Sequence, residues 1–216
     1  LHYFDDLNSK NSDQRITWHT DLISRWINEN TPAYGIGWEP YPISLRAVNW
    51  IKWSILNSNL QDDFIKSLAI QIRYLSKNLE MHLMGNHLIA NGKALIFAGL
   101  FFEGNEASNW YELGLKILKQ ELPEQILSDG GNFELSTMYH AIILEDLLDL
   151  VNIHQAFEKE IPQTILNNIS PMLNWLKSMC HPDGEISFFN DSALGVAPTY
   201  SQLLGYAKKL NIPHWK

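Results

Sequence analysis

The stretch MHLMGNHLIANGKAL, residues 81–95, changes from polar to largely apolar composition at Leu88. From Leu88 to residue 102, apolar side chains occur nearly all round a helical projection, which is typical of a helix buried on both sides. The entry to this helix, Gly85-Asn86-His87, is polar. Residues 138–151 are apolar all round in the same way. The sequence therefore predicts two buried helices, and the first of them starts with an amide and an imidazole.

Six further segments predict helices between turn residues: 13–29, 43–57, 62–80, 106–121, 160–180 and 199–210. Amphipathic helices that alternate with wholly apolar ones indicate two concentric layers, because the inner helices are shielded by the outer ones. We therefore expect an all-α fold, an incomplete α/α toroid of antiparallel helical hairpins. A plain helical bundle is the alternative. Residues 185–189 are the best candidate for a strand.

Composition narrows the possible partners. The chain has 216 residues, which fits one domain or at most two small ones, and a formal net charge of −8. Nucleic acid is disfavoured because phosphate binding needs a basic surface. No run of 18 apolar residues exists, so we expect no membrane span. The chain begins at Leu1, not Met, so we expect it to be trimmed and any targeting segment to be missing.

Aromatic residues are abundant, with eight Trp, eight Tyr and nine Phe. Two explanations are equally good at this point: surfaces that stack on sugar rings, or a Trp-rich core.

Polar residues interrupt the apolar pattern in four clusters, each at a helix entry or a loop. They are residues 38–42 with Arg46 and Asn49, residues 85–87, residues 129–140, and residues 188–192. In a toroid the inner-helix entries on one side open into one central cleft, so we expect these clusters to converge there.

Asn86 and His87 occupy the start of a helix, where free backbone N–H groups and the helix dipole favour an anion. An amide donates hydrogen bonds without carrying charge, so the pair could hold a carboxylate. The alternative is that Asn86 is an N-cap and His87 a buried polar residue with satisfied hydrogen bonds.

Tyr139 is a candidate proton-transfer group. A phenol needs a cationic or donor neighbour to act as a base near neutrality, and Arg46 or His87 could supply it. The alternative is a core tyrosine bonded to a backbone carbonyl. Glu134 and Asp191 could instead form the carboxylate pair of an inverting glycosidase.

Two other groups of polar residues carry weaker signals. His82 and His87 are five residues apart, which is poor spacing for a metal on one helical face, so we expect no metal site. Glu145, Asp146 and Asp149 read most simply as a solvated helix stripe.

Four motifs in chain order resemble the N-terminal helical domain of the heparinase II/III-like polysaccharide lyases. They are Trp38-x-Pro-Tyr-Pro-x-Ser-x-Arg46-x-x-Asn49-Trp50, Gly85-Asn86-His87-Leu88, Asp129-Gly130-Gly131-x-Phe133-Glu134-x-Ser136-x-x-Tyr139-His140 and Phe189-Asn190-Asp191-Ser192. The resemblance covers nearly the whole chain. It implies one toroid domain over residues 1–216, with a lead-in segment at 1–12 and the helical toroid at 13–210.

The resemblance also implies an activity: β-elimination at a uronic acid of an acidic polysaccharide. Asn86, with His87 beside it, matches the position that neutralises the substrate carboxylate. Tyr139 matches the catalytic tyrosine, which takes the C5 proton, donates to the leaving O4, or both. The side chains expected around the cleft as substrate-binding residues are Trp38, Arg46, Asn49, Glu134 and His140.

Family members normally continue into a β-sandwich that supplies a further catalytic histidine and, in some, a metal. That domain is absent from this chain, so we expect no cofactor here and weak or no activity from the chain alone. The resemblance implies a periplasmic or secreted protein, and it leaves the glycan, endo or exo action and the oligomeric state open. Two other functions stay open: a non-catalytic toroid that binds acidic glycan or serves polysaccharide biosynthesis, and a glycoside hydrolase.

Overall fold

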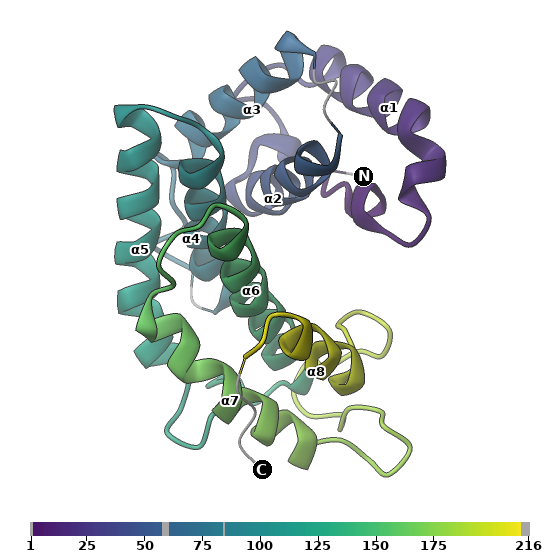
Figure 1. Cartoon of the computed structure of the whole chain (residues 1–216), viewed down its shortest axis with the longest axis vertical. Helices are drawn as coiled ribbons and strands as arrows, with labels where there is room; N and C mark the ends of the chain where they lie inside the picture. The colour runs from purple at the N-terminus through teal and green to yellow at the C-terminus, as the bar shows by residue number, and fades with distance from the viewer. Residues whose placement is uncertain (1, 58–60, 84, 213–216) are drawn as a thin grey trace. The chain divides into compact units, whose positions relative to one another are not determined.

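A computed structural model describes residues 2–57, 61–83 and 85–212, and its regular elements are all helical (Figure 1). The chain divides into two compact units, residues 1–115 and 116–216, each of which is described by itself. That both form one domain stays a prediction. Within the described ranges, no helix is long and apolar enough to cross a membrane.

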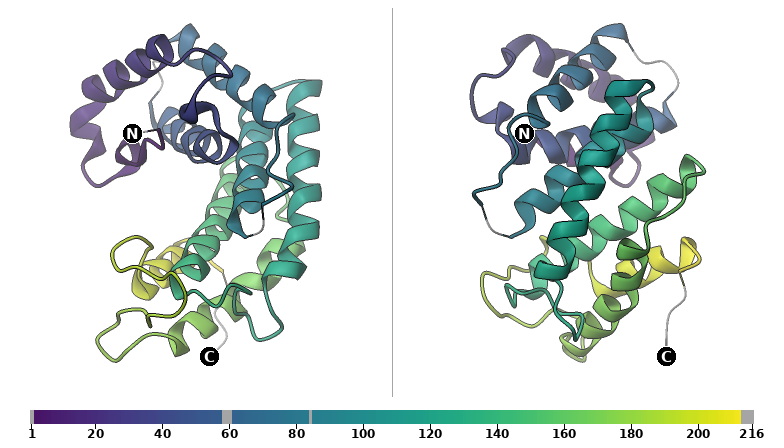
Figure 2. Two further views of the ribbon diagram at one scale, coloured as in Figure 1. Left: turned by 180° about the vertical axis from the view of Figure 1, so that it is seen from behind. Right: turned by 90° about the vertical axis from the view of Figure 1, so that its left-hand side faces the viewer.

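The first unit contains α1 (Ile16–Glu29), α2 (Pro40–Leu56), α3 (Asp62–Leu75), α4 (Asn86–Phe101) and the start of α5 (Asn105–Gln125). Helix α2 packs against both α3 and α4, and the views of Figure 2 show these neighbours from two further sides. Helix α4 is buried nearly all round, since 13 of its 16 residues are inaccessible. The prediction of a doubly covered helix from the apolar pattern is confirmed.

Aromatic side chains fill the core of the first unit. Trp50 is fully buried, and its ring lies 5.0 Å from Phe64, 5.4 Å from Phe4 and 5.7 Å from Trp26, measured between ring centroids. Such edge-on and offset contacts add to the apolar burial. In this unit the Trp-rich core is the right explanation for the aromatic content, although Trp18 is 72% exposed.

The lead-in segment belongs to the same core. Phe4 and Leu7 are buried, and two short 3-10 turns, Asp5–Asn8 and Ser12–Arg15, carry the chain to α1. That residues 1–12 lead into the helical body stays a prediction; within this segment Phe4 and Leu7 are buried in the core of the first unit.

Helices α4 and α5 approach closely through Gly99. A methyl group on Gly99 would lie 2.6 Å from the backbone nitrogen of Tyr111 and 2.8 Å from the carbonyl oxygen of Ala107. These are backbone atoms, so the contact cannot be relieved by a change of rotamer. Glycine is therefore required for the present spacing of the two helices.

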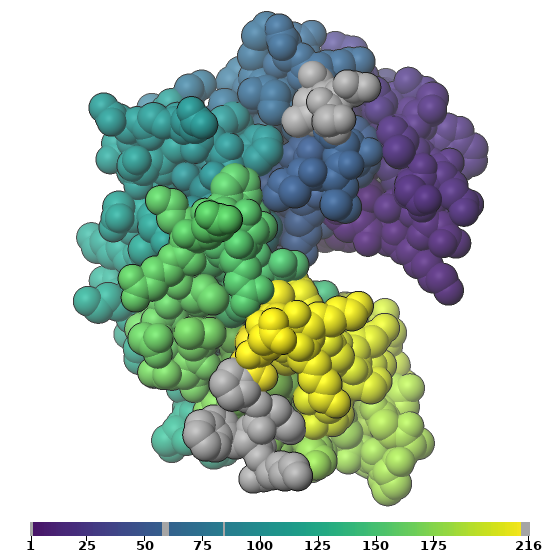
Figure 3. All heavy atoms as spheres, viewed as in Figure 1, coloured from purple at the N-terminus to yellow at the C-terminus, as the bar shows by residue number. Residues whose placement is uncertain are grey.

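The second unit contains α6 (Thr137–Ala156), α7 (Gln163–Ser178) and α8 (Tyr200–Lys209). Helix α6 is buried along most of its length and packs against α7 and α8. The space-filling view shows α8, in yellow, lying directly on the green helices of its own unit (Figure 3).

Three expectations about local structure are wrong. Asp146 and Asp149 are buried, so they are not a solvated stripe; Asp149 accepts a hydrogen bond from the hydroxyl of Tyr206 on α8 at 3.0 Å. Residues 185–189 form no strand within the described chain. Their pairing is limited to an isolated bridge between Ile186 and Cys180, which is too short to be a strand. Helix α3 ends at Leu75 instead of residue 80.

Candidate functional site

Helix α4 starts at Asn86, and Gly85 is its N-cap, with φ 86° and ψ −153°. This conformation favours glycine. Among the described residues no side chain caps the helix, so the first-turn N–H groups and the positive end of the helix dipole favour an anion there. The alternative that Asn86 is the N-cap is wrong, because Asn86 is the first helical residue.

Asn86 and His87 both contact Tyr41, in the first turn of α2. The Nδ2 atom of Asn86 donates to the Tyr41 hydroxyl at 3.2 Å. The His87 ring stacks on the Tyr41 ring, with centroids 4.3 Å apart and planes inclined by 29°. Two of the sequence clusters, residues 38–42 and 85–87, are therefore brought together within the first unit.

A buried polar network supports His87 from the other side. Its Nδ1 atom lies 3.1 Å from Oε1 of Glu80, whose side chain is 9% exposed. The other Glu80 oxygen accepts from Nδ2 of Asn91 at 3.1 Å, and Asn91 also donates to Ser44 at 3.0 Å. Sequence reasoning missed Glu80, because it lies outside every helix and seven residues before its partner.

A hollow of about 440 Å³ borders this network. It is lined by Glu39, Pro40, Tyr74, Asn78, Leu79, Glu80, His82 and Leu83. Glu80 therefore contributes to the wall of the hollow as well as to the contact with His87.

In the second unit, a serine and a loop hold the start of α6. Ser136 is the N-cap and accepts from the backbone N–H of Tyr139 at 3.4 Å. Ser192 lies 3.0 Å from Ser136, accepts from the N–H of Met138 at 3.3 Å, and donates to the carbonyl of Phe189 at 2.6 Å. The clusters at residues 129–140 and 188–192 therefore meet, as expected, around α6. Tyr139 is half-buried in its first turn.

His140, expected to bind substrate, lies wholly inside the second unit. Nδ1 accepts from the backbone N–H of Asn132 at 3.2 Å, and Nε2 donates to the carbonyl of Met172 at 2.9 Å. Its ring lies 4.5 Å from that of Trp175. Burial lowers the pKa of His140 to about 4, against the opposing effects of the Met172 carbonyl and the charge of Asp129. The ring is a neutral structural element, so this placement does not support contact with substrate.

Arg46 and Trp38 are also inside the fold. Arg46 is completely buried; Nε donates to Gln71 at 2.7 Å, and the guanidinium lies 3.9 Å over the Trp26 ring. Burial lowers the pKa of Arg46 to about 9, so it stays charged at neutral pH. Trp38 is 3% exposed and packs edge-on against Tyr74. Both hold the first unit together and neither is placed to meet a polysaccharide.

The last two expected substrate residues organise chain segments. Nδ2 of Asn49 donates to the carbonyl of Tyr3 at 2.9 Å and to Asp5 at 3.0 Å, which ties the lead-in segment to α2. The Glu134 carbonyl accepts from Asn190 at 3.0 Å, which joins the two loops of the second unit. That the residue pairs of the two units face one cleft stays a prediction.

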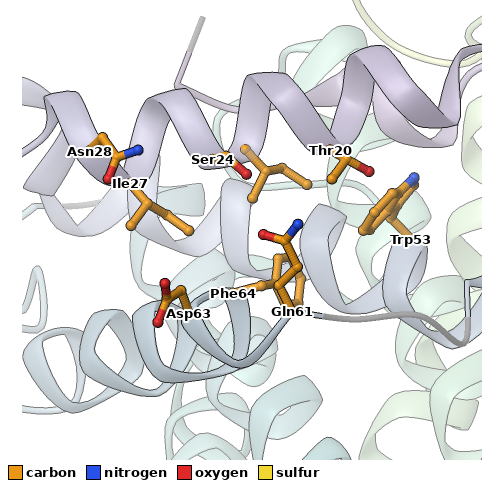
Figure 4. Close-up of a pocket in the computed structure, with 9 residues that line it drawn as sticks. Thr20, Ser24, Ile27, Asn28, Trp53, Gln61, Asp63 and Phe64 are labelled. Carbon is orange, nitrogen blue, oxygen red and sulfur yellow. The ribbon is translucent and has the colours of Figure 1, made fainter.

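A separate cavity of about 150 Å³ lies among α1, α2 and the start of α3 (Figure 4). Its lining residues are Thr20, Ile23, Ser24, Ile27, Asn28, Trp53, Gln61, Asp63 and Phe64. None of them belongs to the four sequence motifs. Across the described residues, no three His, Cys, Asp or Glu side chains cluster as metal ligands would.

Comparison with known proteins identifies relatives. A family profile described as "Heparinase II/III N-terminus" matches residues 8–210. The chain is 34% identical over 113 residues to a heparin-sulfate lyase of Bacteroides stercoris, and 31% identical over 133 residues to a heparin-sulfate lyase of Pedobacter heparinus. These alignments cover 51% and 60% of the chain but only 17% and 20% of the relatives.

Solved structures show the same fold. The crystal structure of heparinase III matches 93% of the chain and 33% of its own length, with a TM-score of 0.76 and 23% identity. Heparan sulfate lyase HepC from Pedobacter heparinus matches 97% of the chain and 35% of its own length, with a TM-score of 0.65 and 23% identity. The predicted all-α toroid is confirmed, and the plain bundle is the wrong alternative.

Proposed function

Since the chain belongs to the heparinase II/III N-terminus family, we propose that it is the helical part of a lyase that cleaves a uronic-acid-containing acidic polysaccharide by β-elimination. The relatives named heparin-sulfate lyase support this activity. The observation that carries the proposal is the position of Asn86 and His87 at the uncapped start of α4. The proposal includes a periplasmic or secreted location, where the protein would have access to such polysaccharides.

The reaction requires stabilisation of negative charge. Loss of the C5 proton beside a carboxylate places a second negative charge on the resulting enolate. The Asn86 amide and the first-turn N–H groups of α4 act as donors to that carboxylate. Asn86 is nearly buried and held by Tyr41, so its amide is already oriented before substrate binds.

Tyr139 transfers the proton. Removal of the C5 proton gives the enolate; the C4–O4 bond then breaks, a C4=C5 double bond forms, and the leaving O4 receives a proton. Tyr139 serves as the acid, the base or both, a role worth about 10²–10⁴ in rate. Its half-exposed position in the first turn of α6, beside the loop held by Ser192, supports this assignment. Trp38, Arg46 and His140 then maintain the framework from inside the fold.

The test uses full-length protein and follows the ultraviolet absorbance of the 4,5-unsaturated uronate, which only elimination produces. We expect Tyr139→Phe and Asn86→Ala each to lower turnover at least about a hundredfold. The matched control Tyr34→Phe changes a tyrosine that is 79% exposed and leaves turnover unchanged.

Near-normal turnover in both site variants would show that the site assignment is wrong. New reducing ends without the absorbance would indicate a glycoside hydrolase. Binding of acidic glycan with neither signal would indicate the non-catalytic alternative.

A further inference from the structure

Glu80 and Tyr41 hold the ring of His87 in a defined orientation. The ring stacks on Tyr41, and Nδ1 lies 3.1 Å from Oε1 of Glu80. An ionised carboxylate only accepts hydrogen bonds, so Nδ1 must carry the proton in this contact. Nε2 takes part in no hydrogen bond with the residues that the structure describes, and the His87 side chain is 35% exposed.

Asn91 fixes the carboxylate in turn. The backbone N–H of Glu80 donates to Oδ1 of Asn91 at 3.0 Å, and a backbone N–H can only donate. The amide orientation of Asn91 is therefore settled, and its Nδ2 faces both Oε2 of Glu80 and Oγ of Ser44. Oε2 of Glu80 therefore accepts a hydrogen bond from the amide of Asn91, and Oε1 is left to accept from Nδ1 of His87.

We infer that Glu80 is a positioning residue that keeps the proton of neutral His87 on Nδ1 and so presents the lone pair of Nε2 to the ligand. This inference deepens the proposed function and depends on it for the identity of the ligand. A neutral His87 then accepts at Nε2 and does not donate to the substrate carboxylate. The uncharged side-chain donor to that carboxylate is Asn86.

The variant Glu80→Gln tests this inference because the hydrogen-bond donors around position 80 fix the orientation of the new amide. Its oxygen must face Nδ2 of Asn91, since two NH₂ groups cannot bond to each other. Its NH₂ group then faces Nδ1 of His87 and donates to it. The proton of His87 is thereby moved to Nε2, so the tautomer is inverted without a change in side-chain volume.

The tautomer is read from ring nitrogen resonances in ¹⁵N NMR of the full chain, at a pH of about 8, where an ordinary histidine is neutral. His87→Gln assigns the signals. We expect a protonated Nδ1 in the wild type and a protonated Nε2 in Glu80→Gln. Glu39→Gln removes an exposed carboxylate from the wall of the same hollow and leaves the His87 tautomer unchanged.

Turnover provides a second readout. We expect Glu80→Gln to lower kcat at least about tenfold, because the inverted ring presents an N–H instead of a lone pair to the substrate, with KM changed less than about twofold. Circular dichroism checks that the variant is folded. A wild-type ring protonated on Nε2, or an unchanged tautomer in a folded Glu80→Gln, overturns the inference. If the variant does not fold, the wild-type tautomer alone decides. A protein without lyase activity would refute the proposed function and leave this NMR result standing.

Discussion

Acidification should destabilise the second unit through His140. The ring is inaccessible, neutral and bonded on both nitrogens, and burial lowers its pKa to about 4. An unfolded chain has histidines with a pKa of about 6.5. Between these two values the unfolded state binds a proton that the folded state does not, so stability falls as the pH falls.

The size of the effect follows from the two pKa values. Each pH unit between about 6.5 and about 4 contributes about 1.4 kcal/mol, so the full loss is about 3 kcal/mol. The loss is complete below the folded-state pKa and absent above about pH 7. Burial also lowers the pKa of His154, which adds a loss of the same sign. A domain with a typical stability of about 5–15 kcal/mol would lose a large part of it.

The assay is urea unfolding at a series of pH values from about 7 to about 4, followed by tryptophan fluorescence. The variant His140→Gln keeps a donor for Met172 but has no group that titrates, so its stability should fall by about 3 kcal/mol less over this range. His181→Gln, at an exposed histidine, is the matched control and should behave as the wild type. Parallel pH profiles for the wild type and His140→Gln would refute the reasoning.

Three further predictions concern the packing, the first with a matched control variant. Gly99→Ala should destabilise the protein by about 1–3 kcal/mol in urea unfolding, whereas Gly205→Ala, a helical glycine with open space at its Cβ, should stabilise it by up to about 1 kcal/mol; equal effects would contradict the close contact. Arg46→Lys should lower the free energy of unfolding by about 2 kcal/mol, since an ammonium cannot reproduce both the Nε contact with Gln71 and the Nη1 contact with the carbonyl of His2; an unchanged unfolding midpoint would count against this. Ser192→Ala should lower the free energy of unfolding by about 1 kcal/mol and speed proteolysis of the loop at 187–196, and unaltered cleavage would argue against its role in holding that loop to the start of α6.

The helices were predicted well from the sequence where a helix is buried on all sides, because such a helix has apolar residues nearly all round. Most positions of α4 and α6 are apolar, so both helices could be predicted without knowledge of distant contacts. Helix ends were less accurate: α7 begins at Gln163, after Pro162, although the apolar face suggested residue 160. Where a helix ends depends on how the next segment packs, and the periodicity of apolar residues carries no information about that packing.

The candidate site was harder to predict because buried and functional polar residues look alike in a sequence. Arg46, His140 and Asn86 all interrupt apolar helices and all are buried, but Arg46 and His140 have no exposed surface and bond within the core, whereas Asn86 lies in the first turn of α4. The role of Glu80 could not be predicted from the sequence, because its contacts with His87 and Asn91 form only in the folded chain. Tertiary partners, and not residue type, separate these cases.

The ties between residues 2–8 and α2 have a practical consequence for expression. Arg46 donates a hydrogen bond to a carbonyl of this segment, and Asn49 donates to it at two points. The side chains of Phe4 and Leu7, which belong to the segment, are buried. A recombinant version that starts at α1 would expose the aromatic core residues that this segment covers. It would also remove one hydrogen-bond acceptor of the buried Arg46. Residues 2–8 are therefore part of the folded first unit and should be kept when the helical unit is expressed.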